Sequence, residues 1–382
     1  MNDRYTVVST QSWMSRLSGS VKGIGFGLLL FVAAWPLLWW NEGRAVLTAQ
    51  SLTEGAGLVV SVSADRVDPA NEGRLIHVNG RAVTGETLTD PDFPAASVTA
   101  LRLERKVEMF QWKEHQETTE KKNVGGSVER QTTYTYSKDW SSSRIDSSRF
   151  HQPAGHENPS TMPYDQLSLT ASDVTVGAFS LPRSLTDNLS ASDPLRLEAP
   201  DSDHAAGPRI VRGQYYIGAN PDAPAIGDMR IRHTHAPQQD VSIIARQQGD
   251  SFGGYQTSDG KRTLLMIKPG LHNADAMFSA AQSANQTMTW LLRGAGLMLM
   301  LIGLRMVFGV LGVIGDVVPF VGDVLRLGTG LISLAISLVC SLLVIAVAWI
   351  FYRPVLGAGL LAVAVAIMVI VTMQARKRRQ AT

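Results

Sequence analysis

An uncharged run of 18 residues, 23–40, constrains the fold of this chain more than any other feature. Its length is about the minimum for a helix that crosses a hydrocarbon core of roughly 30 Å. Trp39 and Trp40 close the run, as aromatic residues do where a helix reaches the membrane surface. No small-x-small cleavage pattern follows it. The sequence therefore predicts a first transmembrane helix over residues 23–40, kept as an anchor rather than cleaved as a signal peptide.

A second apolar zone, residues 291–373, is long enough for several membrane crossings. Polar and proline-containing breaks divide it. We predict three transmembrane helices within it, four in all, and an amphipathic helix on the membrane surface before it. The predicted segments are 271–290 (amphipathic helix), 294–315, 327–350 and 355–373 (transmembrane helices), 316–326 (polar break) and 374–382 (basic tail).

The region between the apolar zones, residues 41–270, shows the period-two alternation of β-strands. In the best example, residues 101–112, Leu103, Val107 and Met109 fall on one face. Turn-rich pieces separate such runs. The sequence therefore predicts an α+β membrane protein whose large β-rich domain, a barrel or a sandwich, is inserted between the first and second transmembrane helices. Short helices are expected near 165–171 and 184–189.

Basic residues flank the apolar zones at both chain ends. Arg16 and Lys22 precede the first run, and residues 376–379 follow the last. Because positive charge near a span favours the cytoplasmic side, both tails, 1–22 and 374–382, are expected in the cytoplasm. An even number of spans agrees with this arrangement and places the β-rich domain outside the cytoplasm.

The composition excludes some classes of function. The formal net charge is +2, and no basic stripe occurs before the last ten residues, so nucleic acid is not an expected partner. Cys340 is the single cysteine, which excludes an intramolecular disulfide and a cysteine zinc cluster. The β-rich region has no glycine-rich phosphate loop and no Gly-x-Ser-x-Gly elbow. We therefore expect no cofactor and no enzyme activity.

One tetrapeptide occurs twice, as Asn41-Glu42-Gly43-Arg44 and as Asn71-Glu72-Gly73-Arg74. With other segments in the same order, it resembles the LUMA family, also called the transmembrane protein 43 family. The resembling segments are NEGRAVLTAQSLTEG (41–55), NEGRLIHVNG (71–80), LRLERKVEMFQWKE (101–114), TYTYSKDW (133–140), GHENPS (155–160), IGDMRI (226–231), SIIARQQGD (242–250), WLLRGAG (290–296) and FYRP (351–354).

The resemblance implies the same four-span plan with a large loop after the first span. It also implies self-association and no established enzyme activity. The eukaryotic members lie in the endoplasmic reticulum and inner nuclear membrane, linked to emerin and lamins. The Ala- and Gly-rich style of this chain predicts a bacterial member, in the inner membrane with a periplasmic domain. A bacterium has no lamina, so these protein partners are not carried over.

The repeated tetrapeptide allows a structural and a chemical interpretation. Glu42 can pair with Arg44, and Gly43 permits a turn with positive φ where the chain leaves the membrane. No catalytic residue stands beside the motif in the sequence. A role in chain exit and packing is therefore favoured over chemistry.

His233 and His235 lie on one face of a predicted strand and form a weak candidate metal pair. Asp201, Asp203 and His204 precede them in the sequence. Two histidines in a polar strand are more often solvated than bound to metal. The interpretation without a metal is therefore favoured.

Arg305 interrupts a predicted span, where an unpaired cation costs at least ~2.5 kcal/mol. We expect it to pair with a carboxylate or a backbone carbonyl, or to reach towards the surface. The nearest acids, Asp316 and Asp323, lie in the polar break, and eleven residues of straight helix put Asp316 about 16 Å away. A structural role is favoured over an ion or proton path. Arg353 and Pro354 form the predicted turn before the last span.

Three functions stay open at this point. The favoured one is a non-catalytic scaffold that forms a homo-oligomer and organises membrane protein or lipid assemblies. Its expected partners are the bilayer, further copies of the chain and unidentified membrane or extracytoplasmic proteins. The second is a channel or transporter that uses Arg305 and residues 316–326. The third is an extracytoplasmic enzyme, which the lack of a catalytic motif disfavours.

Overall fold

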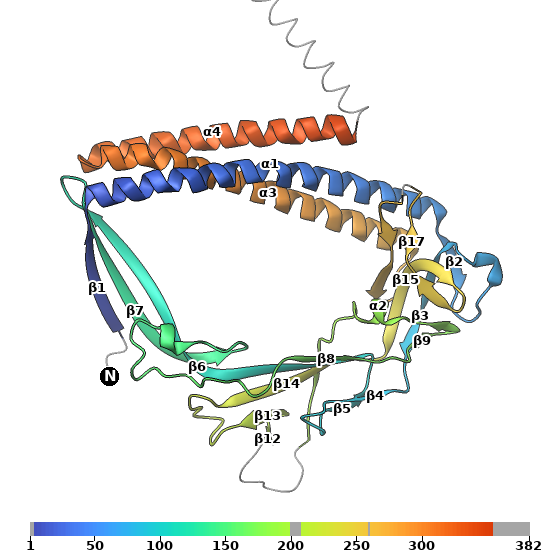
Figure 1. Cartoon of the computed structure of the whole chain (residues 1–382). Coiled ribbons are helices and arrows are strands. Elements are labelled where there is room, and N and C mark those ends of the chain that lie inside the picture. Colours follow the sequence, from blue (N-terminus) through green and yellow to red (C-terminus); the bar gives the residue numbers. More distant parts are fainter. Residues whose placement is uncertain (1–3, 199–207, 259, 354–382) are drawn as a thin grey trace, which may run out of the picture. The chain divides into compact units, whose positions relative to one another are not determined.

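The computed structural model describes residues 4–198, 208–258 and 260–353 (Figure 1). The chain forms two compact units, which we call the β-rich unit and the helical unit. The β-rich unit comprises Met1–Val7, Thr53–Thr118 and Thr132–Ser279, and the helical unit comprises Val8–Leu52, Thr119–Gln131 and Ala280–Thr382.

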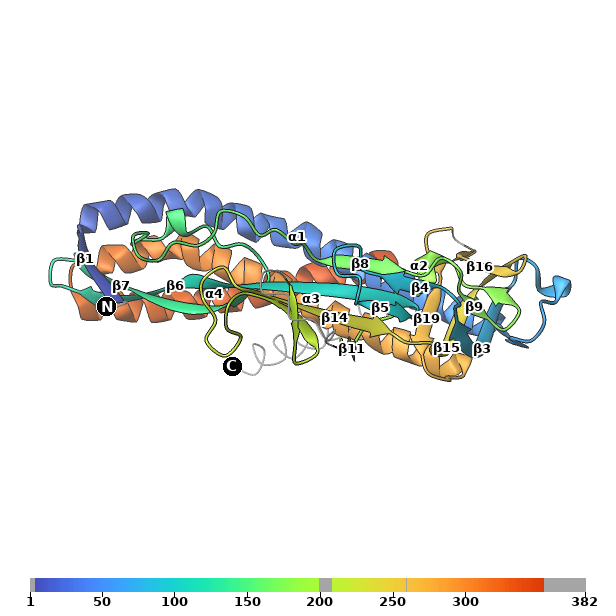
Figure 2. The same cartoon turned by 90° about the horizontal axis from the view of Figure 1, so that it is seen from below.

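Three long helices run side by side in the helical unit (Figures 1 and 2). They are α1 (Trp13–Leu58), α3 (Ala274–Gly315) and α4 (Pro319–Tyr352), and the first residues of α3 and the last of α1 belong to the β-rich unit. All three are long and apolar enough to cross a membrane. These helices agree with three of the four predicted spans, and the fourth, 355–373, lies outside the described residues with Pro354 and the basic tail.

The helices extend beyond the predicted limits. The helix α1 continues past Trp40 to Leu58. The predicted amphipathic helix 271–290 and the span 294–315 form one helix, α3, since no glycine or proline separates them. The predicted break 316–326 narrows to residues 316–318, because α4 begins at Pro319, where a proline suits the first turn.

The larger sheet has the order β1-β7-β6-β14-β13-β12, with β11 also paired to β14 and β8 to β6. Its strands are β1 (Arg4–Gln11), β6 (Arg102–Lys122), β7 (Val128–Ser141), β8 (Leu167–Thr170), β11 (Asp193–Leu195), β12 (Arg209–Val211), β13 (Gln214–Ile217) and β14 (Met229–Ala236).

The second sheet has the order β19-β15-β16-β10-β9-β3-β2, and β15 also pairs with β3. Two strand pairs, β17 with β18 and β4 with β5, complete the β-structure. These strands are β2 (Val60–Ser63), β3 (Leu75–Val83), β4 (Thr87–Thr89), β5 (Ser97–Thr99), β9 (Thr175–Val176), β10 (Phe179–Ser180), β15 (Gln239–Gln248), β16 (Ser251–Gly253), β17 (Tyr255–Gln256), β18 (Thr263–Leu264) and β19 (Met266–Pro269).

The alternation predicted for β6 is confirmed, because Leu103, Val107 and Met109 are all buried. They contribute to two cores of the β-rich unit, one around Leu103 and one around Val107 and Met109. A short helix, α2 (Arg183–Thr186), overlaps the first half of the predicted 184–189 region. The helix predicted near 165–171 is wrong: this segment forms β8, because Leu167 to Thr170 pair antiparallel with β6.

Candidate functional site: two polar layers in the helical unit

The first Asn-Glu-Gly-Arg segment lies inside α1, and its side chains bond to α3. The Asn41 amide donates to the Thr289 carbonyl oxygen at 3.1 Å. Arg44 donates to Asn285 Oδ1 and to Thr289 Oγ1, each at 3.0 Å. The Asn285 amide in turn donates to the Ala45 carbonyl oxygen at 3.0 Å. Because α3 satisfies these polar groups, α1 stays helical where the polarity of the sequence changes.

Glu42 joins all three helices. The Arg293 guanidinium of α3 donates to its carboxylate twice, at 2.7 and 2.8 Å, and the Trp349 indole of α4 donates at 2.8 Å. Glu42 is buried, so this two-point geometry and the third donor satisfy a carboxylate that water does not reach. We call the following set the Glu42 layer: Asn41, Glu42, Arg44, Asn285, Thr289, Arg293 and Trp349.

Glycines allow the helices of this unit to approach closely. A Cβ added at Gly27 would lie 2.6 Å from the Gly303 carbonyl oxygen, so the backbones of α1 and α3 touch there. A Cβ added at Gly43 would lie 2.6 Å from the Tyr352 ring of α4. Gly43 is helical and provides space for this ring, whereas the sequence suggested a turn with positive φ.

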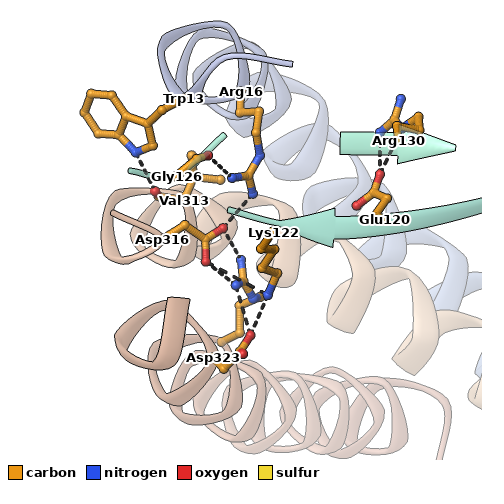
Figure 3. A network of polar contacts seen from close by, with 10 residues as sticks. Trp13, Arg16, Glu120, Lys122, Gly126, Arg130, Val313, Asp316 and Asp323 are labelled. Carbon is orange, nitrogen blue, oxygen red and sulfur yellow. Dashed lines mark hydrogen bonds and ion pairs between the residues drawn. The ribbon is translucent and has the colours of Figure 1, made fainter. Parts of the chain in front are cut away.

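The opposite ends of the helices meet around Asp316, which follows α3 and is buried (Figure 3). Arg16 of α1 donates to its carboxylate at 2.6 Å, and Arg326 of α4 at 2.8 Å. Burial acts to raise the pKa of Asp316, but the bonds and charges of Arg326 and Arg16 outweigh it and hold this pKa below its usual value. The carboxylate is therefore ionised and neutralised from two helices. We call the following set the Asp316 layer: Arg16, Asp316, Asp323 and Arg326.

The turn between β6 and β7 also contacts this layer (Figure 3). Lys122 pairs with Asp323 at 2.5 Å, and the Gly125 amide donates to the Val317 carbonyl oxygen at 3.1 Å. Arg16 donates to the Gly126 carbonyl oxygen at 2.6 Å. We call residues 122–127 the hairpin tip. It contacts the Asp316 layer through two ion pairs of Lys122, with Asp323 and with Asp316 at 4.0 Å, and through the Gly126 carbonyl oxygen.

The two layers are separated by about the thickness of a membrane. At a rise of 1.5 Å per residue, the separation of the two layers along each helix is roughly 35–39 Å. This distance is greater than the thickness of a hydrocarbon core, about 30 Å, and smaller than that of a full bilayer, about 40–45 Å. The residue separations are 26 in α1 (Arg16 to Glu42), 23 from α3 to the turn (Arg293 to Asp316) and 23 in α4 (Arg326 to Trp349).

Arg305 lies on α3 between the layers, and its side chain is exposed. A Cβ added at Gly330 of α4 would lie 3.4 Å from its guanidinium, so the two helices are adjacent here. Within residues 4–198, 208–258 and 260–353, no ion pair of Arg305 is present, and Asp316 and Asp323 pair with other cations. The expected partner for Arg305 is thus not among these acids.

The second Asn-Glu-Gly-Arg segment has a different structure. Asn71 ends a short 3-10 helix (Pro69–Asn71), and Gly73 has a φ of 75°. The Gly73 amide donates to the Gln247 carbonyl oxygen at 3.0 Å, and Glu72 accepts from the Gly249 amide at 2.9 Å. This copy is a turn that starts β3 beside β15. The same four residues are helical in one place and a turn in the other because their partners differ.

The two candidate metal ligands lie on β14, where His233 is buried and pairs with Asp90 at 2.7 Å. The same carboxylate pairs with Arg105 at 2.7 Å. No cluster of three potential metal ligands occurs among the described residues, and Asp201, Asp203 and His204 lie outside them. His233 thus hydrogen-bonds to Asp90 in a buried polar network of the β-rich unit, in which Arg105 pairs with the same carboxylate.

Sequence reasoning missed most partners of the two layers. Arg293 and Trp349 complete the Glu42 layer, and Arg326 and Lys122 neutralise Asp316 and Asp323. The sequence offered one signal for these partners: Arg293 is a cation directly before the predicted span 294–315. Arg353, a candidate residue, ends α4 with its guanidinium 5.8 Å from the Trp349 ring centroid.

Three membrane-length helices tied together by two polar layers, with a β-rich unit in the same chain, define an integral membrane protein of the α+β class. The family model described as Transmembrane protein 43 matches residues 109–354. The chain belongs to the transmembrane protein 43 family.

Relatives in this family align with nearly the whole chain. Transmembrane protein 43 of Rattus norvegicus and that of Homo sapiens are each 36 % identical over 358 residues, covering 91 % of this chain and 88 % of theirs. The homologue from Drosophila melanogaster is 31 % identical over 348 residues, covering 88 % of this chain and 90 % of its own. No solved structure gives a significant match. These relatives are animal proteins, and the bacterial origin of this chain stays a prediction.

Proposed function

We propose that the protein is a non-catalytic, four-span membrane scaffold that self-associates and organises membrane protein or lipid assemblies through its β-rich unit. The pairing of Glu42 with Arg293 and Trp349 is the main support. The charged groups of both layers bind one another and hold the helices together. The outer surface of the helices carries apolar side chains, such as Leu29 (61 % exposed) and Leu331 (62 % exposed). These side chains are available to contact lipid or other helices.

We further propose that the two layers lie at the two membrane surfaces, with both tails in the cytoplasm. In a bacterium the β-rich unit would be periplasmic, and in a eukaryote it would be luminal. Lys122 follows α1 and precedes α3 in the chain, so a bilayer crossed by α1 separates Lys122 from Arg16. The membrane-inserted form therefore keeps the pairing of Arg16 and Arg326 with Asp316. It loses the contacts of the hairpin tip and the pairing of β1 with β7, because β1 precedes α1 in the chain.

Self-association requires a helix surface that is not already used inside one chain. Gly27, Gly296 and Gly312 pack against neighbouring helices of the same unit. A Cβ added at Gly309 or at Gly294 would meet no atom of the described residues within 4 Å. We propose Gly309 as a position where α3 of a second copy approaches.

The channel alternative receives less support from the same geometry. The acids that it would use are paired within the helices: Asp316 with Arg16 and Arg326, and Asp323 with Arg326. An ion path needs polar groups that are free to bind and release the ion. The ion pairs at residues 316–326 therefore favour a structural role for this segment.

Mass measurement of the full-length protein in nanodiscs tests the proposal. We expect an oligomer, and Gly309→Leu should shift it towards the monomer. Gly25→Leu on α1 shows whether the effect is specific to α3, because a Cβ at Gly25 also meets no atom within 4 Å and the added side chain is the same. A strictly monomeric wild type would refute self-association. A hydrolase or transferase activity lost on changing one His or Glu of the β-rich unit would refute the non-catalytic role.

A further inference from the structure

A basic cleft lies in the β-rich unit, on a face of the larger sheet. Its volume is about 550 Å³, within the usual range of roughly 300–1,000 Å³ for ligand sites. Four cations line it: Lys106 from β6, Arg196 after β11, Arg212 from the β12–β13 turn and Arg232 from β14. None of the described residues that line the cleft is acidic.

The strand pairing places like charges together. Lys106 lies directly opposite Arg232 in the register of β6 and β14, an arrangement that destabilises a sheet unless an anion is near. Glu108, beside them on β6, pairs with both Arg230 and Arg232. Burial acts to raise the pKa of Glu108, but these two arginines keep this pKa below its usual value. Glu108 is thus fully engaged by arginine and does not neutralise Lys106.

Two of the four cations have no counter-charge in the described parts of the chain. Arg212 pairs with Asp222 at 2.5 Å, and Arg232 pairs with Glu108. For Lys106 and Arg196, residues 4–198, 208–258 and 260–353 provide no ion pair. The cleft therefore holds uncompensated positive charge from β6 and from the segment that follows β11.

One side chain of the cleft points to a bound ligand. Thr234 lines the cleft, and its hydroxyl is buried without a hydrogen-bond partner among the described residues. A buried hydroxyl without a hydrogen-bond partner is rare in proteins unless a ligand or a water molecule supplies the partner. Arg212 has a φ of 53°, the only positive φ of a described residue other than glycine. The turn at 212–213 therefore holds an arginine where Asn or Gly is preferred.

We propose that this cleft binds a phosphate-bearing anion. Arginine presents a planar fork of donors that matches phosphate oxygens, lysine adds a point charge, and the Thr234 hydroxyl adds a neutral donor. The phosphate relieves the repulsion between Lys106 and Arg232 and gives Arg196 a partner. This site goes beyond the scaffold role and does not depend on self-association.

Binding to the full-length protein in phosphatidylcholine nanodiscs tests the site. One arm titrates inorganic pyrophosphate by calorimetry, and the other measures co-flotation with vesicles that contain phosphatidic acid. Binding of pyrophosphate assigns a soluble phosphate compound, and binding to the vesicles alone assigns a lipid headgroup. Absence of binding in both arms would overturn the proposal.

Paired variants separate the cleft from general surface charge. We expect Lys106→Gln with Arg196→Gln to weaken binding at least tenfold, and Thr234→Val to weaken it several-fold. The matched control, Arg66→Gln with Lys121→Gln, removes the same charge from exposed positions outside the cleft and should change binding less than twofold. Equal losses in the control and in the cleft variant would refute the site. The cleft variant should keep the circular dichroism of the wild type, because both of its substituted positions are exposed.

Discussion

The carboxylate of Glu42 on α1 accepts two hydrogen bonds from the guanidinium of Arg293 on α3, at 2.7 and 2.8 Å. Both side chains are largely buried, with 2 % and 16 % of their surfaces exposed. A buried pair of this kind contributes little net stability, but loss of one member leaves a charge without a partner. We therefore infer that the pair contributes mainly to specificity: it determines which helices associate, and adds little to the free energy of unfolding.

We expect Glu42→Gln to destabilise the protein by about 3–5 kcal/mol, the usual effect of breaking a buried ion pair. Chemical unfolding of the nanodisc-bound protein measures this change. Glu117→Gln, which removes a carboxylate from an exposed position, should have little effect. The double variant Glu42→Leu with Arg293→Met should recover most of the loss, and a double variant no better than Glu42→Gln would contradict the pairing argument.

Substitution of Gly27 should separate α1 from α3. A Cβ at this position would lie 2.6 Å from a backbone oxygen, which cannot move aside as a side chain can. We expect Gly27→Ala to cost about 1–3 kcal/mol, as overpacking does. Gly25→Ala on the same helix is the control, and it should be neutral or stabilising by up to about 1 kcal/mol. Equal thermal stability of the two variants would argue against close contact of the helices.

Membrane insertion should break the contact between the hairpin tip and the Asp316 layer. Cysteines at Lys122 and Asp323, in a Cys340→Ser background, should react with a short bis-maleimide in detergent and fail to do so in sealed membranes. The control pair, Glu120 and Arg130, bonds within the hairpin at 2.6 Å and should cross-link in both. Cross-linking of the first pair in sealed membranes would refute the four-span topology.

Labelling of sealed cells from outside tests the same topology independently. A cysteine at Ser141 should react with an impermeant maleimide if the β-rich unit lies outside the cytoplasm, as we propose. A cysteine at Gln380 should react only after the cells are opened. Reaction at both positions in sealed cells would contradict the orientation.

Acid should destabilise the β-rich unit through His233. Burial lowers the pKa of His233 below its usual value of 6.5, while Asp90 acts in the other direction. The unfolded chain therefore binds a proton near pH 6.5 that the folded chain does not. The stability that this group contributes is complete above pH 6.5 and falls as the pH decreases below it.

Unfolding measurements at pH 7.5 and 5.5 test this prediction. The loss of unfolding free energy between the two pH values should be smaller in His233→Gln than in the wild type. The exposed His115→Gln variant should keep the wild-type effect, and identical pH dependence in all three proteins would exclude His233.

Local patterns predicted three of the membrane helices and the main strands. The alternation around Val107 reports which side of β6 is buried, since each strand residue points to the face opposite its neighbour. The limits of the helices were harder to predict, because α1 continues through Asn41 and Arg44 only when α3 supplies their hydrogen bonds. Nothing local distinguishes those residues from Asn71 and Arg74, which form a turn.

The partners of the candidate residues could not be predicted at all. Arg16 and Asp316 are 300 positions apart, and Glu42 and Trp349 are 307 apart. A single sequence contains no signal for such pairs beyond opposite charge, and the chain has many charges of both signs. The predicted pairing of Glu42 with Arg44 differs from the structure for this reason: both side chains reach across to α3 instead.

The pairing of Glu42 with a residue 251 positions later has a consequence for synthesis of the protein. At a translation rate of about 5–20 residues per second, Arg293 emerges roughly 10–50 s after Glu42. During this interval α1 has reached the bilayer, and no other helix is present to neutralise the Glu42 carboxylate. The nascent chain must hold that charge in water, or a component of the insertion machinery must cover it, until α3 arrives.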